Sequence, residues 1–476
     1  MNELEQKISQ KDSKENKNNT FSISDKNDDE DNLNDNNQNN SKEDNSFKMK
    51  KMKSVQIENN FSPLAIKKIK NSVNVNYKKN SPIRDQINKE KIERISQPTF
   101  ISSKTLTSPN INDLAINNDV PLKINMKKPS LGLSKLKEMA NLNAVIQCFV
   151  HLKEITEGFL NLEKENFFKE KGKYNISKAY LDLINNLFFP EKFKNLSGEY
   201  SSSAFYNILI KENKQILNKN SFYCNCKDLL DLIINGLHKE LNIKKNINQL
   251  SSDNLKQYEE LSEKEALYKY LEEFTKSNNS LISKYLYGLL KNKIICQKCK
   301  KINFNFKCYS FLYFNLSEIK NNLNQDKEKK NFKLMDFFEY YNNKQEYLTE
   351  EKGLYCRNCK SKTDTTIKNS IYSSHIIMPI IIDRGDDCAL DKDKIDFPDE
   401  LDLSKYIEYK SSSKNFYLCG VVTNLGLSNN FGKFEAFCKM EKNGPWYNYK
   451  NEKVSSCNKE DLHNNGLQYI LFYHKI

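Results

Sequence analysis

The chain lacks several features that would place it outside the cell or in a membrane. Its longest uninterrupted apolar run, "IIMPIII" at 376–382, has seven residues, whereas a membrane-spanning helix needs about 20. The N-terminal sequence "MNELEQKISQKD" has no apolar core of the kind that marks a secretion signal. We therefore expect a soluble intracellular protein, in the cytoplasm, the nucleus or both, with no membrane partner and with reduced thiols.

Arginine is also scarce. The 476 residues include only four arginines, and the formal net charge of +13 arises from 75 basic and 62 acidic residues spread along the chain. Arginine is the preferred residue for reading bases and gripping phosphates. The densest basic cluster, "KMKKMK" at 48–53, is either a nuclear-import or anion-binding patch or a local result of the general lysine enrichment. We predict no nucleic-acid partner.

Cysteine and tryptophan are absent from residues 1–127, which are rich in Asn, Lys, Asp and Ser. Such a composition buries too little apolar surface to offset the entropy lost on ordering. We therefore predict a disordered tail over 1–127. Residues 128–476, where Phe, Tyr, Leu and Ile are frequent, are predicted to form the folded domain.

The pattern of the folded part changes from helical to strand-like. The segments 136–150 and 226–242 place apolar residues at spacings of three and four, which predicts amphipathic helices. From about residue 291 onward, short runs of β-branched and aromatic residues such as "SHIIMPIIIDR" and "NFYLCGVVTNLG" predict strands. Helices first and strands later indicate an α+β fold.

Two CxxC pairs carry the strongest local signal. Cys296 and Cys299 form "CQKC", Cys356 and Cys359 form "CRNC", and 56 residues lie between the pairs. Two such pairs of thiolates complete a tetrahedral zinc site, and four sulfur ligands leave no open position for water. We predict a structural zinc ion, with four free thiols or a redox pair as the alternatives.

Several blocks of the folded part resemble the ubiquitin-specific protease family, a group of papain-like cysteine proteases. "GLSKLKEMANLNAVIQ" (132–147) is similar to the family's cysteine box, "GLxNxGNTCYxNSxxQ". "YCNCKDLLDLIINGLHKELN" (223–242) is similar to the block "QQDAxEFLxxLLDxLHxELN". "VVTNLGLSNNFGKFEAFCKMEKNGPWYNYKNEKV" (421–454) resembles the histidine box, and "IDFPDELDLSKYI" (395–407) and "YILFY" (469–473) match further family segments.

The resemblance implies a papain-like α+β fold built as a hand. It implies a helical thumb over 128–290, zinc-ribbon fingers over 291–370 and a β-rich palm over 371–476, with ubiquitin as the partner. The family places acidic side chains of its second block against the basic tail of ubiquitin, and the two positions here are Asn225 and Asp228. Because one charge is lost and one is kept, the sequence leaves ubiquitin binding open.

The residues that perform catalysis in the family are replaced in this chain. The nucleophile position is Ala140, the histidine position is Lys433 and the oxyanion position is Lys135. The residue that would orient the histidine is Lys450, with Asn451 next to it. A methyl group cannot attack a carbonyl, and an ordinary lysine is protonated at neutral pH and therefore a poor base. The histidines of the chain lie at other positions: His151, His238, His375, His463 and His474.

We therefore predict a catalytically inactive pseudoenzyme that binds ubiquitin or serves as a scaffold in the ubiquitin pathway or another protein assembly. The alternative is a divergent but active cysteine-type deubiquitinase that uses another of the twelve cysteines, which lie between Cys148 and Cys457. Cys148 stands eight residues beyond Ala140, about 12 Å along a helix, and we expect it to pack in the core.

Overall fold

The fold is described from a computed structural model for residues 131–476 with several internal gaps. The predicted tail, 1–127, therefore lies outside the described residues. The structure describes residues 131–135, 140–192, 198–213, 225–244, 261–323, 332–349, 351–385, 392–410, 413–425, 433–464 and 466–476.

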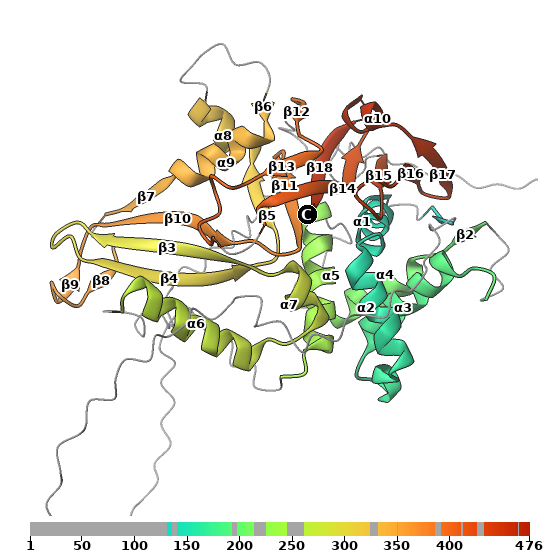
Figure 1. Ribbon diagram of the computed structural model, residues 1–476, viewed down its shortest axis with the longest axis horizontal. Helices are drawn as coiled ribbons and strands as arrows, with labels where there is room; N and C mark the ends of the chain where they lie inside the picture. Colours follow the sequence, from blue (N-terminus) through green and yellow to red (C-terminus); the bar gives the residue numbers. More distant parts are fainter. Residues whose placement is uncertain are drawn as a thin grey trace, which may run out of the picture. The chain divides into compact units, whose positions relative to one another are not determined.

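Helices dominate the described chain up to residue 286 (Figure 1). They are α1 (Ala140–Val150), α2 (Lys153–Lys164), the 3-10 turn η2 (Phe167–Lys169), α3 (Asn175–Phe188), α4 (Ser203–Glu212), α5 (Cys226–Leu241), α6 (Glu263–Ser277) and α7 (Leu281–Leu286). The helix predicted at 226–242 is α5, which begins where the Asn225 side chain accepts the backbone N–H of Asp228 at 2.8 Å. At α6, Ser262 and Glu265 form a capping box.

A four-stranded antiparallel sheet follows, with the order β4-β3-β10-β7. Its strands are β3 (Gly288–Cys296), β4 (Ile302–Tyr309), β7 (Gln345–Leu348) and β10 (Thr365–Ser373). Figure 1 shows α6 lying along this sheet beside β4. Tyr270 of α6 is buried in one cluster with Leu289 and Phe306, and its hydroxyl accepts the backbone N–H of Cys308 at 2.8 Å.

A larger sheet of eight described strands holds the C-terminal part of the chain, in the order β17-β16-β15-β14-β18-β11-β5 with β13 paired to β14. Its strands are β5 (Leu312–Asn315), β11 (Ile377–Asp383), β13 (Glu400–Asp402), β14 (Asn415–Asn424), β15 (Phe434–Cys438), β16 (Trp446–Lys450), β17 (Lys453–Cys457) and β18 (Leu467–Lys475). The smaller pairs are β1 (Gly132–Leu133) with β2 (Glu199–Tyr200), β6 (Phe332–Lys333) with β12 (Ile395–Asp396), and β8 (Tyr355–Cys356) with β9 (Ser361–Lys362).

The large sheet buries both of its faces. Alternate residues of β11 divide between two hydrophobic clusters, as the two-residue period of a strand requires. Ile377 and Ile381 belong to the cluster that contains α1 and α5. Ile380 and Ile382 belong to the cluster that contains α8 (Leu316–Leu323) and α9 (Leu334–Asn343). α1 therefore packs against one face of the large sheet.

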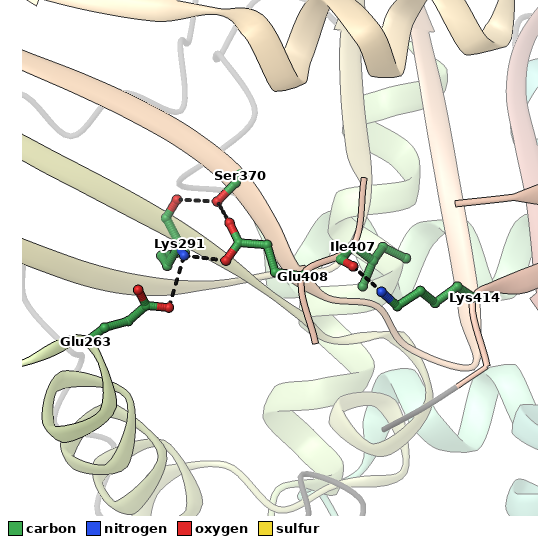
Figure 2. Close-up of polar contacts among 6 residues, drawn as sticks. All are labelled: Glu263, Lys291, Ser370, Ile407, Glu408 and Lys414. Atoms are coloured by element: carbon green, nitrogen blue, oxygen red, sulfur yellow. Dashed lines mark hydrogen bonds and ion pairs between the residues drawn. The ribbon is translucent and has the colours of Figure 1, made fainter. Parts of the chain in front are cut away.

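The junction between the two sheets contains a network of charged side chains (Figure 2). Lys291 of β3, only 9% exposed, is paired with Glu408 and, at 3.0 Å, with Glu263 of α6. Ser370 of β10 donates to Glu408 at 2.5 Å, and Lys414 donates to the carbonyl of Ile407. Burial opposes the charge of Lys291, but the two carboxylates outweigh it and raise its pKa. The network joins α6, β3 and β10 to the segment that leads into β14.

The α+β class predicted from the sequence is confirmed. The sequence pattern missed helices in the strand-rich part, where α8, α9 and α10 (Lys459–Asn464) interrupt the strands. No helix among the described residues is both long and apolar enough to cross a membrane. The boundaries at 290 and 370 between thumb, fingers and palm stay predictions.

Candidate active site and metal cluster

The residue in the nucleophile position begins a buried helix. α1 starts at Ala140, and Asn141 to Val150 are buried behind it. The N-terminal end of a helix carries partial positive charge, which in a cysteine protease stabilises the thiolate. The chain therefore keeps the helix end at this position without a thiol on it. Lys135, in the oxyanion position, follows β1 and is exposed.

Asn143 ties the first turns of α1 to two distant segments. Its Nδ2 donates to the carbonyl of Ser134 and to Oδ1 of Asn451, both at 3.0 Å. Its Oδ1 accepts the hydroxyl of Ser202 at 2.7 Å. The structure thus brings the cysteine-box helix and the histidine-box turn together.

Asn451 forms the tight turn between β16 and β17, and it has a φ of +51°. Its carbonyl accepts the backbone N–H of Leu133 at 2.9 Å. A Cβ on Gly132 would lie 2.4 Å from the same carbonyl oxygen, so only glycine allows this approach. The close contact explains why Gly132 stands where the family's cysteine box begins.

Lys450 is engaged by a buried acid that the sequence reading did not single out. Its Nζ is ion-paired with Glu435, whose side chain is only 3% exposed. Asn448 Nδ2 donates to the other oxygen of Glu435 at 2.9 Å. Ala436 faces Tyr449 across β15 and β16, which sets Glu435 opposite Lys450. A buried carboxylate needs such partners. An acid in the apolar run "KFEAFC" was the one available signal.

Lys433, in the histidine position, is exposed and stands immediately before β15. Its carbonyl accepts the backbone N–H of Leu425 at 3.0 Å. Lys433 stands two residues before Glu435. Because β15 and β16 are antiparallel, the start of β15 lies beside the end of β16 and the turn at Asn451. The chain thus has a lysine at the position where the family resemblance predicts the histidine.

The two positions matched to ubiquitin-tail contacts lie in the first turn of α5. The Asn225 side chain caps the helix, so its oxygen is occupied. Asp228 is exposed. Desolvation by the surrounding protein nevertheless raises the pKa of its carboxyl, while the charge of Lys227 and the side chain of Asn225 act in the opposite direction. Lys227 Nζ also lies 5.0 Å from the ring centre of Tyr313 on β5. The sequence pattern did not identify Lys227 as a candidate site residue.

Three other titratable side chains of the described core, His151, Cys148 and Cys226, are buried. His151 is buried between the carbonyl of Gln147 at 2.6 Å and the hydroxyl of Tyr449 at 3.0 Å, and burial lowers its pKa to about 4. Cys148 is buried, and its sulfur lies 3.6 Å from the sulfur of Cys438. Burial also raises the pKa of Cys226. Cys224 lies outside the described residues. Each described group behaves as a core residue.

The four cysteines of the CxxC pairs form one cluster. Their sulfur atoms all lie within 4.8 Å of one another. The sulfur of Cys296 lies 3.8 Å from that of Cys359, and Cys299 lies 3.6 Å from Cys356. Zinc–sulfur bonds of about 2.3 Å place tetrahedral sulfur atoms about 3.8 Å apart. The cluster therefore could hold a zinc ion of the structural kind.

The surroundings of the cluster favour the thiolate form at two of its four cysteines, Cys296 and Cys299. Burial works against ionisation of Cys296, but the backbone N–H of Cys299 and the Thr363 hydroxyl, 3.1 Å from the sulfur, lower its pKa to about 6. Backbone donation at Lys301 lowers the pKa of Cys299. In contrast, burial raises the pKa values of Cys356 and Cys359, and the neighbouring sulfur atoms add to the rise at Cys359. Four sulfur atoms this close suit a divalent cation that neutralises them.

Comparison with known proteins agrees with these features. The family model described as "Ubiquitin carboxyl-terminal hydrolase" matches residues 131–372 and 389–473. The chain belongs to this ubiquitin carboxyl-terminal hydrolase family. Human ubiquitin carboxyl-terminal hydrolase 15 is 28% identical over 200 residues, which cover 40% of this chain and 19% of that protein. Ubiquitin carboxyl-terminal hydrolase 4 of Saccharomyces cerevisiae is 22% identical over 374 residues, which cover 73% of this chain and 39% of that protein.

Solved structures show the same fold. A structure described as the SAGA DUB module of Ubp8, Sgf11, Sus1 and Sgf73 bound to monoubiquitin matches with a TM-score of 0.53 and 18% identity. The match covers 74% of this chain and 72% of that chain. The same module bound to ubiquitin aldehyde matches with a TM-score of 0.52 and 18% identity. At this identity the likeness concerns the fold, which is the mixed α+β fold of ubiquitin-specific proteases with a four-cysteine cluster.

Proposed function

We propose that this protein is a catalytically inactive member of its family that binds ubiquitin and does not cleave it. The ion pair of Lys450 with Glu435 is the observation that carries the proposal. In the family mechanism, a carboxylate or amide at the Lys450 position orients a histidine that removes the thiol proton. Here that position carries a cation that is already paired with a buried acid, so the site is rebuilt around a different charge pattern.

The loss of function at this site rests on several independent replacements. Ala140 supplies no nucleophile and Lys433 supplies no neutral base. Cys148 and Cys226, two of the remaining thiols, are buried. These facts weigh against the alternative, an active deubiquitinase that uses a displaced cysteine.

Ubiquitin binding is supported by the retained scaffold and by the relatives. Solved relatives with the same fold are described as bound to monoubiquitin or ubiquitin aldehyde. We assign residues 128–290 as the thumb, 291–370 as the fingers and 371–476 as the palm. Asp228 would face the basic ubiquitin tail, as the family resemblance implies.

Zinc belongs to the proposal as a structural ion. Cys296, Cys299, Cys356 and Cys359 would hold it, and four thiolate ligands leave it no place for catalytic water. Its loss would release the turn that follows β3 and the turn that joins β8 to β9. The reduced thiols that such a site needs agree with an intracellular location.

A titration of isotope-labelled ubiquitin with the full chain tests this function by NMR. We expect chemical-shift changes on the ubiquitin tail and its hydrophobic face. Asp228→Lys should weaken binding by about tenfold, because a like charge replaces the attractive one. Glu165→Lys, the same charge change at an exposed residue after α2, is the matched control and should bind as the unaltered chain does.

A scaffold without ubiquitin affinity is the second candidate. It is favoured by the side chain of Asn225, which is occupied as a helix cap, and by Lys227, which adds positive charge beside Asp228. An absence of shifts in ubiquitin at high concentration would select this candidate. Shifts that Asp228→Lys leaves unchanged would preserve ubiquitin binding but reject the assigned contact.

A further inference from the structure

The end of the four-stranded sheet that carries the four cysteines is strongly basic. We name residues 296–302 and 351–366 the cysteine tip. Seven of its 23 residues are basic, against 75 of 476 in the whole chain, and only Glu351 and Asp364 are acidic. The basic residues are Lys298, Lys300, Lys301, Lys352, Arg357, Lys360 and Lys362. Zinc with four thiolates carries two net negative charges, so the tip stays positive with the ion bound.

Several of these lysines are exposed and uncommitted. Lys298, Lys352, Lys360 and Lys362 are exposed, and none of them forms an ion pair with any residue that the structure describes. In contrast, Lys291 of β3 is paired with two carboxylates, those of Glu263 and Glu408. Local charge balance therefore does not account for these four lysines.

The two turns of the tip place lysine where glycine is usual. The residue after the second cysteine of each CxxC pair is left-handed, with φ of +60° at Lys300 and +54° at Lys360. A side chain in this conformation costs about 1 kcal/mol relative to glycine. Both turns have a lysine at this position despite that cost, which favours a role for the lysine side chain.

Large apolar side chains are exposed in the cysteine tip and on the nearby strand β7. Tyr347, Tyr355 and Ile302 are 57%, 55% and 42% exposed. Ile302, Ile295, Thr366 and Tyr347 face one another across β4, β3, β10 and β7, so they share one face of the sheet. The hydroxyl of Tyr347 donates to Asp364 at 2.6 Å, which fixes its ring. Figure 1 shows β8 and β9, which carry Tyr355 and Lys362, at the far end of this sheet.

We propose that the cysteine tip is a docking surface for an acidic protein segment that also carries apolar side chains. Exposed aromatic and aliphatic residues within a charged rim are typical of protein interfaces. Nucleic acid fits less well, because the tip has one arginine among its seven basic residues. The tip comprises other residues than the ubiquitin contact proposed at Asp228, so the inference does not depend on that contact.

Fluorescence anisotropy with the full chain tests the surface. The probe is a labelled peptide of about 12 residues that alternates glutamate with leucine or phenylalanine. Lys298→Glu/Lys360→Glu should weaken binding by about tenfold, and raising the salt from about 50 to about 300 mM should weaken binding to the unaltered chain. The matched control, Lys164→Glu/Lys171→Glu, reverses two exposed lysines, one at the end of α2 and one before α3, and should bind as tightly as the unaltered chain.

Further arms separate the proposal from general charge attraction. Tyr355→Ser should weaken the acidic peptide severalfold without a change in charge, and a glutamine version of the peptide should not bind. Zinc content and melting temperature show whether a variant is folded, and Lys298→Gln/Lys360→Gln replaces the glutamate pair if that variant loses zinc. Equal affinity of the tip variant and the control, no binding by the unaltered chain, or tighter binding of single-stranded DNA than of the acidic peptide would each overturn the proposal.

Discussion

Replacement of Lys450 by methionine is expected to leave a buried carboxylate without its cation. Glu435 is 3% exposed and has two partners, Lys450 and Asn448, of which only Asn448 would remain. Breaking a buried ion pair from one side costs about 3 to 5 kcal/mol. Lys450 is itself 48% exposed, so solvent already screens part of the attraction. We therefore expect Lys450→Met to lower the free energy of unfolding by about 2 to 3 kcal/mol.

A double-mutant cycle separates this pair from a general effect of β16. Glu435→Gln removes the charge and keeps a side chain that accepts from Asn448, so Lys450→Met should cost less in that background by about 1 to 2 kcal/mol. Urea unfolding followed by the fluorescence of Trp446 suits the test, because Trp446 is the one tryptophan, lies in β16 and is 5% exposed. The control is Lys153→Met, which breaks the exposed pair with Glu441 at 2.8 Å.

The control should cost less than about 1 kcal/mol, as exposed ion pairs do. Lys450→Met would refute the reasoning if it cost no more than Lys153→Met. Additive effects in the Glu435 and Lys450 cycle would also show that the two side chains do not interact, and the rebuilt centre would then need another explanation.

Three further outcomes are expected. Lys291→Met should destabilise the protein by about 1 to 2 kcal/mol, since Glu263 and Glu408 are 41% and 36% exposed, and hydrogen exchange should quicken in β3 and β10 but not in α3. Metal analysis should find one zinc per chain, and Cys296→Ser should lower both zinc content and melting temperature; unchanged values would rule the site out. The pKa of His151 is lowered to about 4 in the fold, so the unfolded chain binds more protons below pH 6.5. Stability should therefore fall by about 2 kcal/mol from pH 6.5 to 5, and less in His151→Gln.

The repeating parts of the fold could be predicted from the sequence because they depend on local spacing. Apolar residues three and four apart identify α5, and a continuous apolar run identifies β11, which is buried on both faces. The four cysteines could be grouped because thiolates three positions apart have few uses in a reduced chain. No helix was predicted at α9, where "LMDFFEYYNN" lies within the region that the sequence pattern assigned to strands.

The contacts that define the site depend on pairings that no local pattern gives. The Lys450 and Glu435 pair exists because Ala436 and Tyr449 are in register across β15 and β16, and a shift of one residue would send Glu435 to the other face. The bond from Asn143 to Asn451 joins residues 308 positions apart. Positions of replaced catalytic residues could be named from the resemblance, but their new partners came only from the fold.

Native mass spectrometry of the full chain with ubiquitin that carries a C-terminal electrophile tests the central claim most directly. The account predicts a one-to-one complex under native conditions that separates fully into its two components on denaturation. A covalent adduct that survives denaturation would contradict catalytic inactivity, and mapping it to one cysteine would identify the nucleophile. A spectrum with no complex at all would contradict ubiquitin binding and favour the second candidate function, a scaffold without ubiquitin affinity.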